Sequence, residues 1–165
     1  YVKPEPTCEE IAHATILAAR HIRRFGIEPK AALLSASNFG SRDIPSAHKM
    51  RKVLGLVRAR DPNLEIDGEM HGDAAIIREI RERVMPDTTL KGDANLLVFP
   101  SLDAANIALN LIKAMTDALH VGPILLGTAK PAHILTPSVT SRGVVNMSTL
   151  AAVEAQSWRR HHPVA

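Results

Sequence analysis

The chain has a single cysteine, Cys8, and few aromatic side chains, which make up 3% of its 165 residues. One cysteine excludes an internal disulfide, and this suits the reducing cytoplasm, where we expect the protein to reside. No apolar run approaches the roughly 20 residues that a membrane-spanning helix needs. Since stacking aromatics and a basic stripe are also lacking, we expect neither a membrane nor a nucleic acid as the partner.

Outside the C-terminus the chain carries almost no net positive charge. The formal net charge is +3, from 20 Lys and Arg against 17 Asp and Glu. Without Arg159 and Arg160, 18 basic side chains face the same 17 acidic ones, so the body of the chain is near neutral. We therefore assign residues 159–165 to a basic tail and residues 1–158 to one domain. The hydrophobic content of the whole chain, 45%, is enough to form a core.

Helical and strand-like patterns alternate along the sequence. The expected helices cover about residues 8–25, 45–60, 73–84, 101–119 and 140–157. The expected strands cover residues 31–34, 64–67, 94–99 and 121–126. This alternation predicts an α/β domain with three layers. The helix that begins near Ser101 carries few charges and is apolar around most of its circumference, so we expect burial on two sides, for example in a subunit interface.

A polar loop, Ser35–Ser41, follows the first expected strand. Its hydroxyls, its amide and its flexible backbone N–H groups suit a phosphate or a carboxylate. An ordinary strand-to-helix turn explains the same residues equally well. A dinucleotide fingerprint is excluded because the pattern G-x-G-x-x-G is absent.

A second polar segment follows the next expected strand. Asp67, Glu69 and His71 alternate, so an extended backbone would place them on one side. The segment partly resembles a calcium-binding loop, but Arg78 occupies the position that requires a bidentate Glu. We therefore assign no metal site, and we expect Asp73 to cap the following helix.

Familiar catalytic and nucleotide-binding motifs are missing. Gly122 and Gly127 have the spacing of a P-loop, but Lys130 stands three residues after the second glycine instead of directly after it. Lys130 remains a candidate anion contact at the end of a strand. HExxH and G-x-S-x-G are absent, and Cys8 has no evident base beside it. We therefore name no catalytic residue.

Several segments together resemble the phosphate acetyltransferase (phosphotransacetylase) family, in order and spacing over about residues 31–156. They are Leu33–Ser41, Asp67–Ala75, Lys91–Ile107, Gly122–Thr136 and Val144–Gln156. Details such as SNFGS and MHGDAA are more similar to the acetyltransferase-like C-terminal domain of bacterial NADP-dependent hybrid malic enzymes. Because the sequence begins at Tyr1 and not at methionine, we also expect it to be a piece of a longer chain.

The resemblance implies a two-lobed α/β/α sandwich with a mixed sheet, like that of isocitrate and isopropylmalate dehydrogenases, of which this chain is the second half. It implies homo-oligomers and acetyl-CoA as an effector. A malic enzyme catalytic domain in the same polypeptide would convert malate to pyruvate with NADP and Mg²⁺ or Mn²⁺. The acyl-CoA contacts that it suggests are Ser35, Ser37, Asn38, Asn106, Lys130 and Thr136.

The sequence departs from the family where catalysis is carried out. Active transferases follow their Lys-Pro segment with Ser-Arg and then an Asp, to hold phosphate and to activate the CoA thiol. Here the matching positions are Thr136, Pro137 and Gly143, and Phe39 replaces a basic residue of the Ser-rich loop. The resemblance therefore implies a regulatory module that binds acyl-CoA and is inactive as a transferase. Two alternatives stay open: an active transferase that uses Arg142, and a purely structural dimerisation module.

Overall fold

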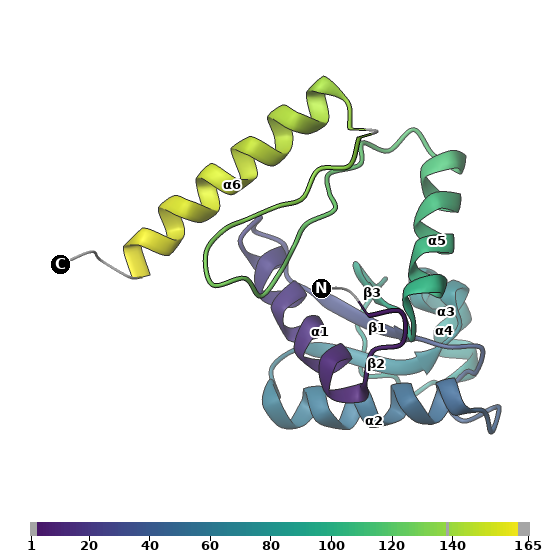
Figure 1. Cartoon of the computed structure of the whole chain (residues 1–165). Coiled ribbons are helices and arrows are strands. Elements are labelled where there is room, and N and C mark those ends of the chain that lie inside the picture. Colours follow the sequence, from purple (N-terminus) through teal and green to yellow (C-terminus); the bar gives the residue numbers. More distant parts are fainter. Residues whose placement is uncertain (1–2, 138, 162–165) are drawn as a thin grey trace. The chain divides into compact units, whose positions relative to one another are not determined.

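The computed structural model describes residues 3–137 and 139–161, and its chain divides into two compact units, Tyr1–Ile112 and Lys113–Ala165 (Figure 1). The elements of the first unit, in chain order, are α1 (Cys8–Arg23), β1 (Lys30–Leu34), α2 (Pro45–Arg60), β2 (Glu65–Met70), α3 (Gly72–Ile76), α4 (Arg78–Val84) and β3 (Leu96–Val98). Helix α5 (Leu102–Met115) starts in the first unit and ends in the second. The second unit also contains α6 (Ser141–His161).

The sheet of the first unit has three parallel strands in the order β2-β1-β3. Side chains of the central strand alternate between two apolar clusters, with Ala31 and Leu33 in one and Ala32 and Leu34 in the other. This alternation follows from the pleat of a strand that is covered on both faces. The strands expected at residues 31–34, 64–67 and 94–99 are confirmed with small shifts in their ends. The described strands are all parallel, so the mixed pairing expected from the resemblance is not seen among them.

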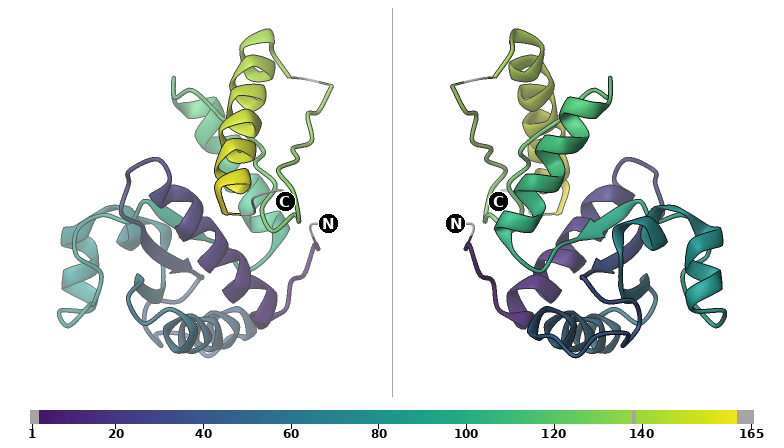
Figure 2. Two further views of the ribbon diagram at one scale, coloured as in Figure 1. Left: turned by 90° about the vertical axis from the view of Figure 1, so that its left-hand side faces the viewer. Right: turned by 90° about the vertical axis from the view of Figure 1, so that its right-hand side faces the viewer.

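Helices α1 and α2 cover one face of the sheet (Figure 2). Ile11 and Ile16 of α1 and Met50 and Val53 of α2 are buried against this face. Helix α1 begins with a capping box, in which the Thr7 hydroxyl accepts from the Glu10 N–H at 3.2 Å and the Glu10 carboxylate accepts from the Thr7 N–H at 2.9 Å. The apolar faces of the two helices thus form the larger part of the core.

Helices α3 and α4 cover the other face, where Ala74 and Ala75 pack on Leu34 and Met70. One continuous helix was expected here, but the backbone of Ile77 is extended (φ −128°, ψ 104°) and separates two short helices. The first unit therefore has helices on both faces of a parallel sheet, which confirms the predicted α/β class.

The second unit differs most from the expectation. The strand predicted at residues 121–126 is wrong, because these residues have no hydrogen-bonded neighbouring strand in the described part of the chain. Instead, the Leu125 N–H donates to Nδ1 of His133 at 3.4 Å, and Nε2 of His133 donates to the Glu154 carboxylate at 3.0 Å. These contacts join the extended segment to α6. The first residues of the expected tail, 159–161, are helical, and residues 162–165 lie outside the described part.

Helix α5 was expected to be buried on two sides, yet none of its residues is buried. Ile107 is 61% exposed and Leu111 is 56% exposed, one turn apart on the same face. Large exposed apolar side chains are also found in the second unit, at Leu119, Val121, Ile134, Leu135, Val144, Val145 and Val153. Among the described residues, no helix is long and apolar enough to cross a bilayer.

Candidate functional site

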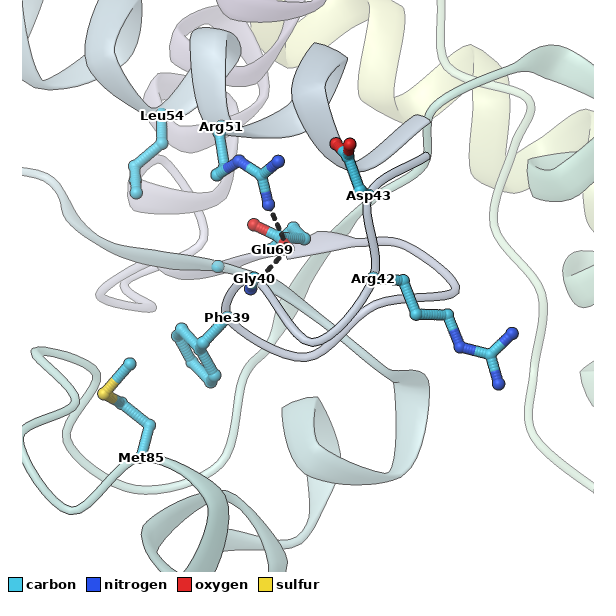
Figure 3. Close-up of a pocket in the computed structure, with 9 residues that line it drawn as sticks. Phe39, Gly40, Arg42, Asp43, Arg51, Leu54, Glu69 and Met85 are labelled. Carbon is cyan, nitrogen blue, oxygen red and sulfur yellow. Dashed lines mark hydrogen bonds and ion pairs between the residues drawn. The ribbon is translucent and has the colours of Figure 1, made fainter. Parts of the chain in front are cut away.

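The buried carboxylate of Glu69 is the centre of the polar cluster at the C-terminal end of β1 and β2. Its side chain is 1% exposed, and its Oε1 accepts three hydrogen bonds. The donors are the Ser37 hydroxyl at 2.8 Å, the Gly40 N–H at 2.8 Å and Nη1 of Arg51 at 2.9 Å, the last two of which are drawn in Figure 3. Such an arrangement holds a charged carboxylate where an unpaired charge would be costly.

The loop between β1 and α2 is folded around this carboxylate. The Phe39 N–H donates to the Glu69 carbonyl oxygen at 2.7 Å, and the Arg42 N–H donates to the Ser37 hydroxyl at 3.1 Å. Phe39 and Gly40 both have positive φ, of 46° and 88°, and this conformation turns the backbone toward Glu69. The loop is therefore a fixed structure, in which Ser37 has a structural role.

Gly68 explains how β2 brings Glu69 to this place. Its φ is 138°, and a Cβ built there would lie 2.7 Å from the Leu33 carbonyl oxygen. The strand register also shifts here, since Leu33 pairs with Gly68 and Leu34 pairs with Met70. Glu69 is thus skipped by the ladder, and its side chain is free to point toward the loop.

This shift breaks the alternation that the sequence suggested for the acidic segment. Asp67 accepts instead from the Thr88 hydroxyl and the Thr89 N–H, both at 2.7 Å. His71 is joined to Asn38, whose Oδ1 accepts from the His71 N–H at 2.7 Å. The three side chains that were expected on one side therefore have three separate environments, and the described residues contain no group of three or more possible metal ligands. Asp73 does not cap α3 as expected, because its carboxylate accepts from the N–H of the next residue at 2.8 Å, while the residue at the N-cap is His71.

A pocket of about 660 Å³ lies beside Glu69 (Figure 3). Its walls come from the loop after β1, from α2, from β2 and from the residue that follows α4. They comprise Phe39, Gly40, Arg42, Asp43, Arg51, Leu54, Gly68, Glu69 and Met85. The volume is within the range of about 300–1,000 Å³ that small-molecule sites occupy. The pocket belongs entirely to the first unit.

The structure brings three of the six candidate ligand contacts together, Ser35, Ser37 and Asn38, all in the loop that borders this pocket. Ser35 donates its N–H to the Met70 carbonyl oxygen at 2.9 Å, and its hydroxyl is buried without a hydrogen-bond partner in the described part. Asn38 connects to His71, as described above.

The other three candidates lie elsewhere in the chain. Asn106 is on α5, where its Oδ1 accepts from the Asn110 amide at 2.7 Å. Lys130 and Thr136 belong to the second unit. The Lys130 Nζ lies 5.9 Å from the centre of the Trp158 ring, a cation–π distance.

Sequence reasoning missed the two residues that most define the pocket. Arg51 was not among the candidates, yet it is paired with Glu69 at 2.9 Å and its side chain is 35% exposed. Glu69 was counted as one of a row of metal-ligand types, not as the partner of the Ser-rich loop. The strand Glu65–Met70 carries three acidic residues, and nothing in its pattern marked Glu69 as the one that pairs with the loop after β1.

Comparison with known proteins supports the resemblance. The pattern of the phosphate acetyl/butaryl transferase family matches residues 1–152. An NAD-dependent malic enzyme of Rhizobium meliloti is 66% identical over 99% of this chain and 21% of its own length. An NADP-dependent malic enzyme of Escherichia coli is 56% identical over 95% of this chain and 21% of its own length. The crystal structure of a phosphotransacetylase from Streptococcus pyogenes matches 97% of this chain and 48% of its own, with a TM-score of 0.85 and 32% identity.

The extent of these matches differs between the two kinds of relative. The chain spans about a fifth of the length of the two malic enzymes and about half of the phosphotransacetylase chain. The family resemblance found in the sequence motifs is confirmed over nearly the whole chain. The chain belongs to the phosphate acetyl/butaryl transferase family.

Proposed function

We propose that the chain is the phosphotransacetylase-like part of an NAD(P)-dependent malic enzyme and that it binds an acyl-CoA for regulation. The observation that carries this proposal is the 66% identity to a malic enzyme over 99% of the chain. Because only 21% of that relative is covered, a malate-oxidising domain would occupy other parts of the same polypeptide. That domain would supply the NAD(P) and divalent-metal chemistry that decarboxylates malate to pyruvate.

The residues at the former catalytic positions support a role without acyl transfer. Pro137 is exposed and has no charged group with which to hold a phosphate. Gly143 has no side chain to accept a proton, and its N–H donates to the Thr140 hydroxyl at 3.1 Å in the first turn of α6. Loss of general base catalysis alone typically costs about two to four orders of magnitude in rate.

Calorimetry with acetyl-CoA on the intact enzyme tests the binding role. We expect saturable binding, with a coupling to the malic site of about 1–3 kcal/mol, which is typical of allosteric pairs. A lack of binding at millimolar acetyl-CoA would disprove the proposal. A thiol-consumption assay with acetyl phosphate on the same enzyme tests whether the module is inactive as a transferase. Rates comparable with those of an active phosphotransacetylase would show that the module is catalytic.

Two other functions have an observation in their favour. Arg142 is exposed in the first turn of α6, one residue before Gly143, and an active transferase would use it to hold phosphate. The exposed apolar face of α5, with Ile107 and Leu111, favours a structural module that mediates self-association. Light scattering together with acetyl-CoA calorimetry on the intact protein separates this last function from ligand binding, because a purely structural module would associate and bind no acyl-CoA.

A further inference from the structure

A row of polar contacts connects the surface histidine His48 to the buried carboxylate of Glu69. Nε2 of His48 faces the Asp43 carboxylate, and Nδ1 lies 3.1 Å from Nη2 of Arg51. Nη1 of the same guanidinium donates to Glu69 Oε1 at 2.9 Å, and the Gly40 N–H donates to that oxygen at 2.8 Å (Figure 3). The His48 side chain is 61% exposed and that of Glu69 is 1% exposed, so the row leads from solvent to the interior of the first unit.

The donors in this row determine where the proton of His48 lies. A guanidinium has five N–H donors and no acceptor, so Nδ1 accepts from Arg51 and carries no proton. The one proton of the ring is then on Nε2, which donates to the Asp43 carboxylate. The contacts in the structure are therefore those of a neutral histidine.

A second proton on His48 would break the contact with Arg51. A protonated imidazole has a donor at both nitrogens, so Nδ1 would present an N–H and a positive charge to a guanidinium only 3.1 Å away. The contact with Asp43 would at the same time become an ion pair, which draws the ring toward the loop. Histidine side chains in general change charge between about pH 5 and pH 8, so this change lies in an accessible range.

The buried end of the row transmits the change to the loop after β1. Arg51 supplies the charge that pairs with the Glu69 carboxylate, and a buried carboxylate without such a partner is costly. The same carboxylate accepts from the Ser37 hydroxyl and the Gly40 N–H, both at 2.8 Å. When Arg51 is displaced, Glu69 loses the partner that keeps it among these donors, and the loop loses its central acceptor.

Other charged groups near the ring belong to the loop, to α2 and to β2. With the two contacts of the ring included, they are Arg42, Asp43, Lys49, Arg51, Lys52 and Glu69. Lys49 and Lys52 pair with carboxylates before and within α1, at 3.4 and 3.6 Å. A charged His48 therefore meets Asp43 as its carboxylate and Arg51 as its opposing cation.

We propose that His48 is a pH-sensitive switch for the loop after β1. The neutral ring supports Arg51 on Glu69 and keeps residues 37–42 closed. The charged ring pairs with Asp43, withdraws its support from Arg51 and loosens the loop. This switch goes beyond the proposed function, since it requires neither an acyl-CoA nor the malate-oxidising domain.

Hydrogen–deuterium exchange of the intact protein, measured in peptides that span residues 36–43, tests the switch. After correction for the intrinsic effect of pH on amide exchange, the loop should exchange about two- to five-fold faster at about pH 5.5 than at about pH 8, as expected for one exposed charge pair. In His48→Asn the side-chain oxygen accepts from Arg51 but does not titrate, so this acceleration should disappear. His13→Asn is the matched control, because His13 is exposed on α1 and the variant should keep the wild-type response.

Two results would overturn the proposal. One is equal corrected exchange of the wild-type loop at the two pH values, and the other is an acceleration that persists in His48→Asn. Peptides of the central strand, residues 30–34, provide the reference for both, since their corrected exchange should not change with pH. Because no ligand is present in this experiment, either result leaves the proposed function standing, whereas acetyl-CoA calorimetry tests that function separately.

Discussion

The close approach of β2 to β1 at Gly68 leads to a quantitative prediction. A Cβ at this position would lie 2.7 Å from the Leu33 carbonyl oxygen and 2.9 Å from the Leu33 Cβ, and both atoms are held in the central strand. Overpacking of this kind costs about 1–3 kcal/mol. The φ of 138° adds about 1–3 kcal/mol of backbone strain for any residue with a side chain. Gly68→Ala should therefore lower the free energy of unfolding by about 2–6 kcal/mol.

Urea unfolding followed by circular dichroism measures this difference. The matched control is Gly72→Ala, because a Cβ at Gly72 meets no atom within 4 Å and its φ is ordinary. We expect the control to change the free energy of unfolding by less than about 1 kcal/mol, since Ala is favoured over Gly in a helix. The reasoning would be refuted if Gly68→Ala destabilised the protein no more than Gly72→Ala.

Four further predictions concern other parts of the chain. Thr7→Ala should lower the free energy of unfolding by about 1 kcal/mol through loss of the cap on α1. Lys3 and then the Thr7 N–H hold the pKa of Glu10 below its usual 4.5, so the stabilisation by this carboxylate is complete above pH 4.5 and is lost as the pH falls through the lowered pKa. Urea titrations should show Glu10→Gln less stable than the wild type at pH 7 and equally stable in strong acid, and a difference that persists in acid would contradict this. Leu111→Asp should reduce self-association in light scattering, and an unchanged mass would show that this face is not an interface. His133→Phe removes the donor to Glu154 and should speed proteolysis between residues 113 and 161. Cleavage confined to the first unit would show that this hydrogen bond does not stabilise the second unit.

The first unit was largely predictable because its signals are local. The expected helix at residues 8–25 and the expected strand at residues 31–34 each rest on neighbouring residues, and the structure contains both as α1 and β1. Ile77 shows the limit of such signals. An apolar helical pattern continues through this residue, but its extended backbone divides the segment into two helices, so periodicity alone did not mark the break.

The second unit was less predictable because a strand is defined by its neighbour. Residues 121–126 have the apolar composition of a buried strand, yet no described segment of this chain pairs with them. The sequence pattern reflects burial and does not reveal which strand supplies the hydrogen bonds. The same holds for α5, whose apolar surface was expected to be covered and is exposed in this chain.

The site shows the same division between local and distant information. The Ser-rich loop was recognised as a candidate from its composition, and the structure places it at the pocket. The pairing of Glu69 with Ser37 and Arg51 could not be predicted, because it depends on a register shift at Gly68 and on contacts 18 and 32 residues apart in the sequence. Long-range polar partners of this kind have no periodic signature.

The central claim is that acyl-CoA binding by this module is coupled to malate oxidation. The most direct measurement is the Kd of acetyl-CoA for the intact enzyme, by calorimetry, with and without saturating malate. Because coupling between two sites is reciprocal, a regulatory module should show a change in Kd of about 5- to 150-fold. Binding with the same Kd in both conditions, or no binding at millimolar acetyl-CoA, would contradict the claim.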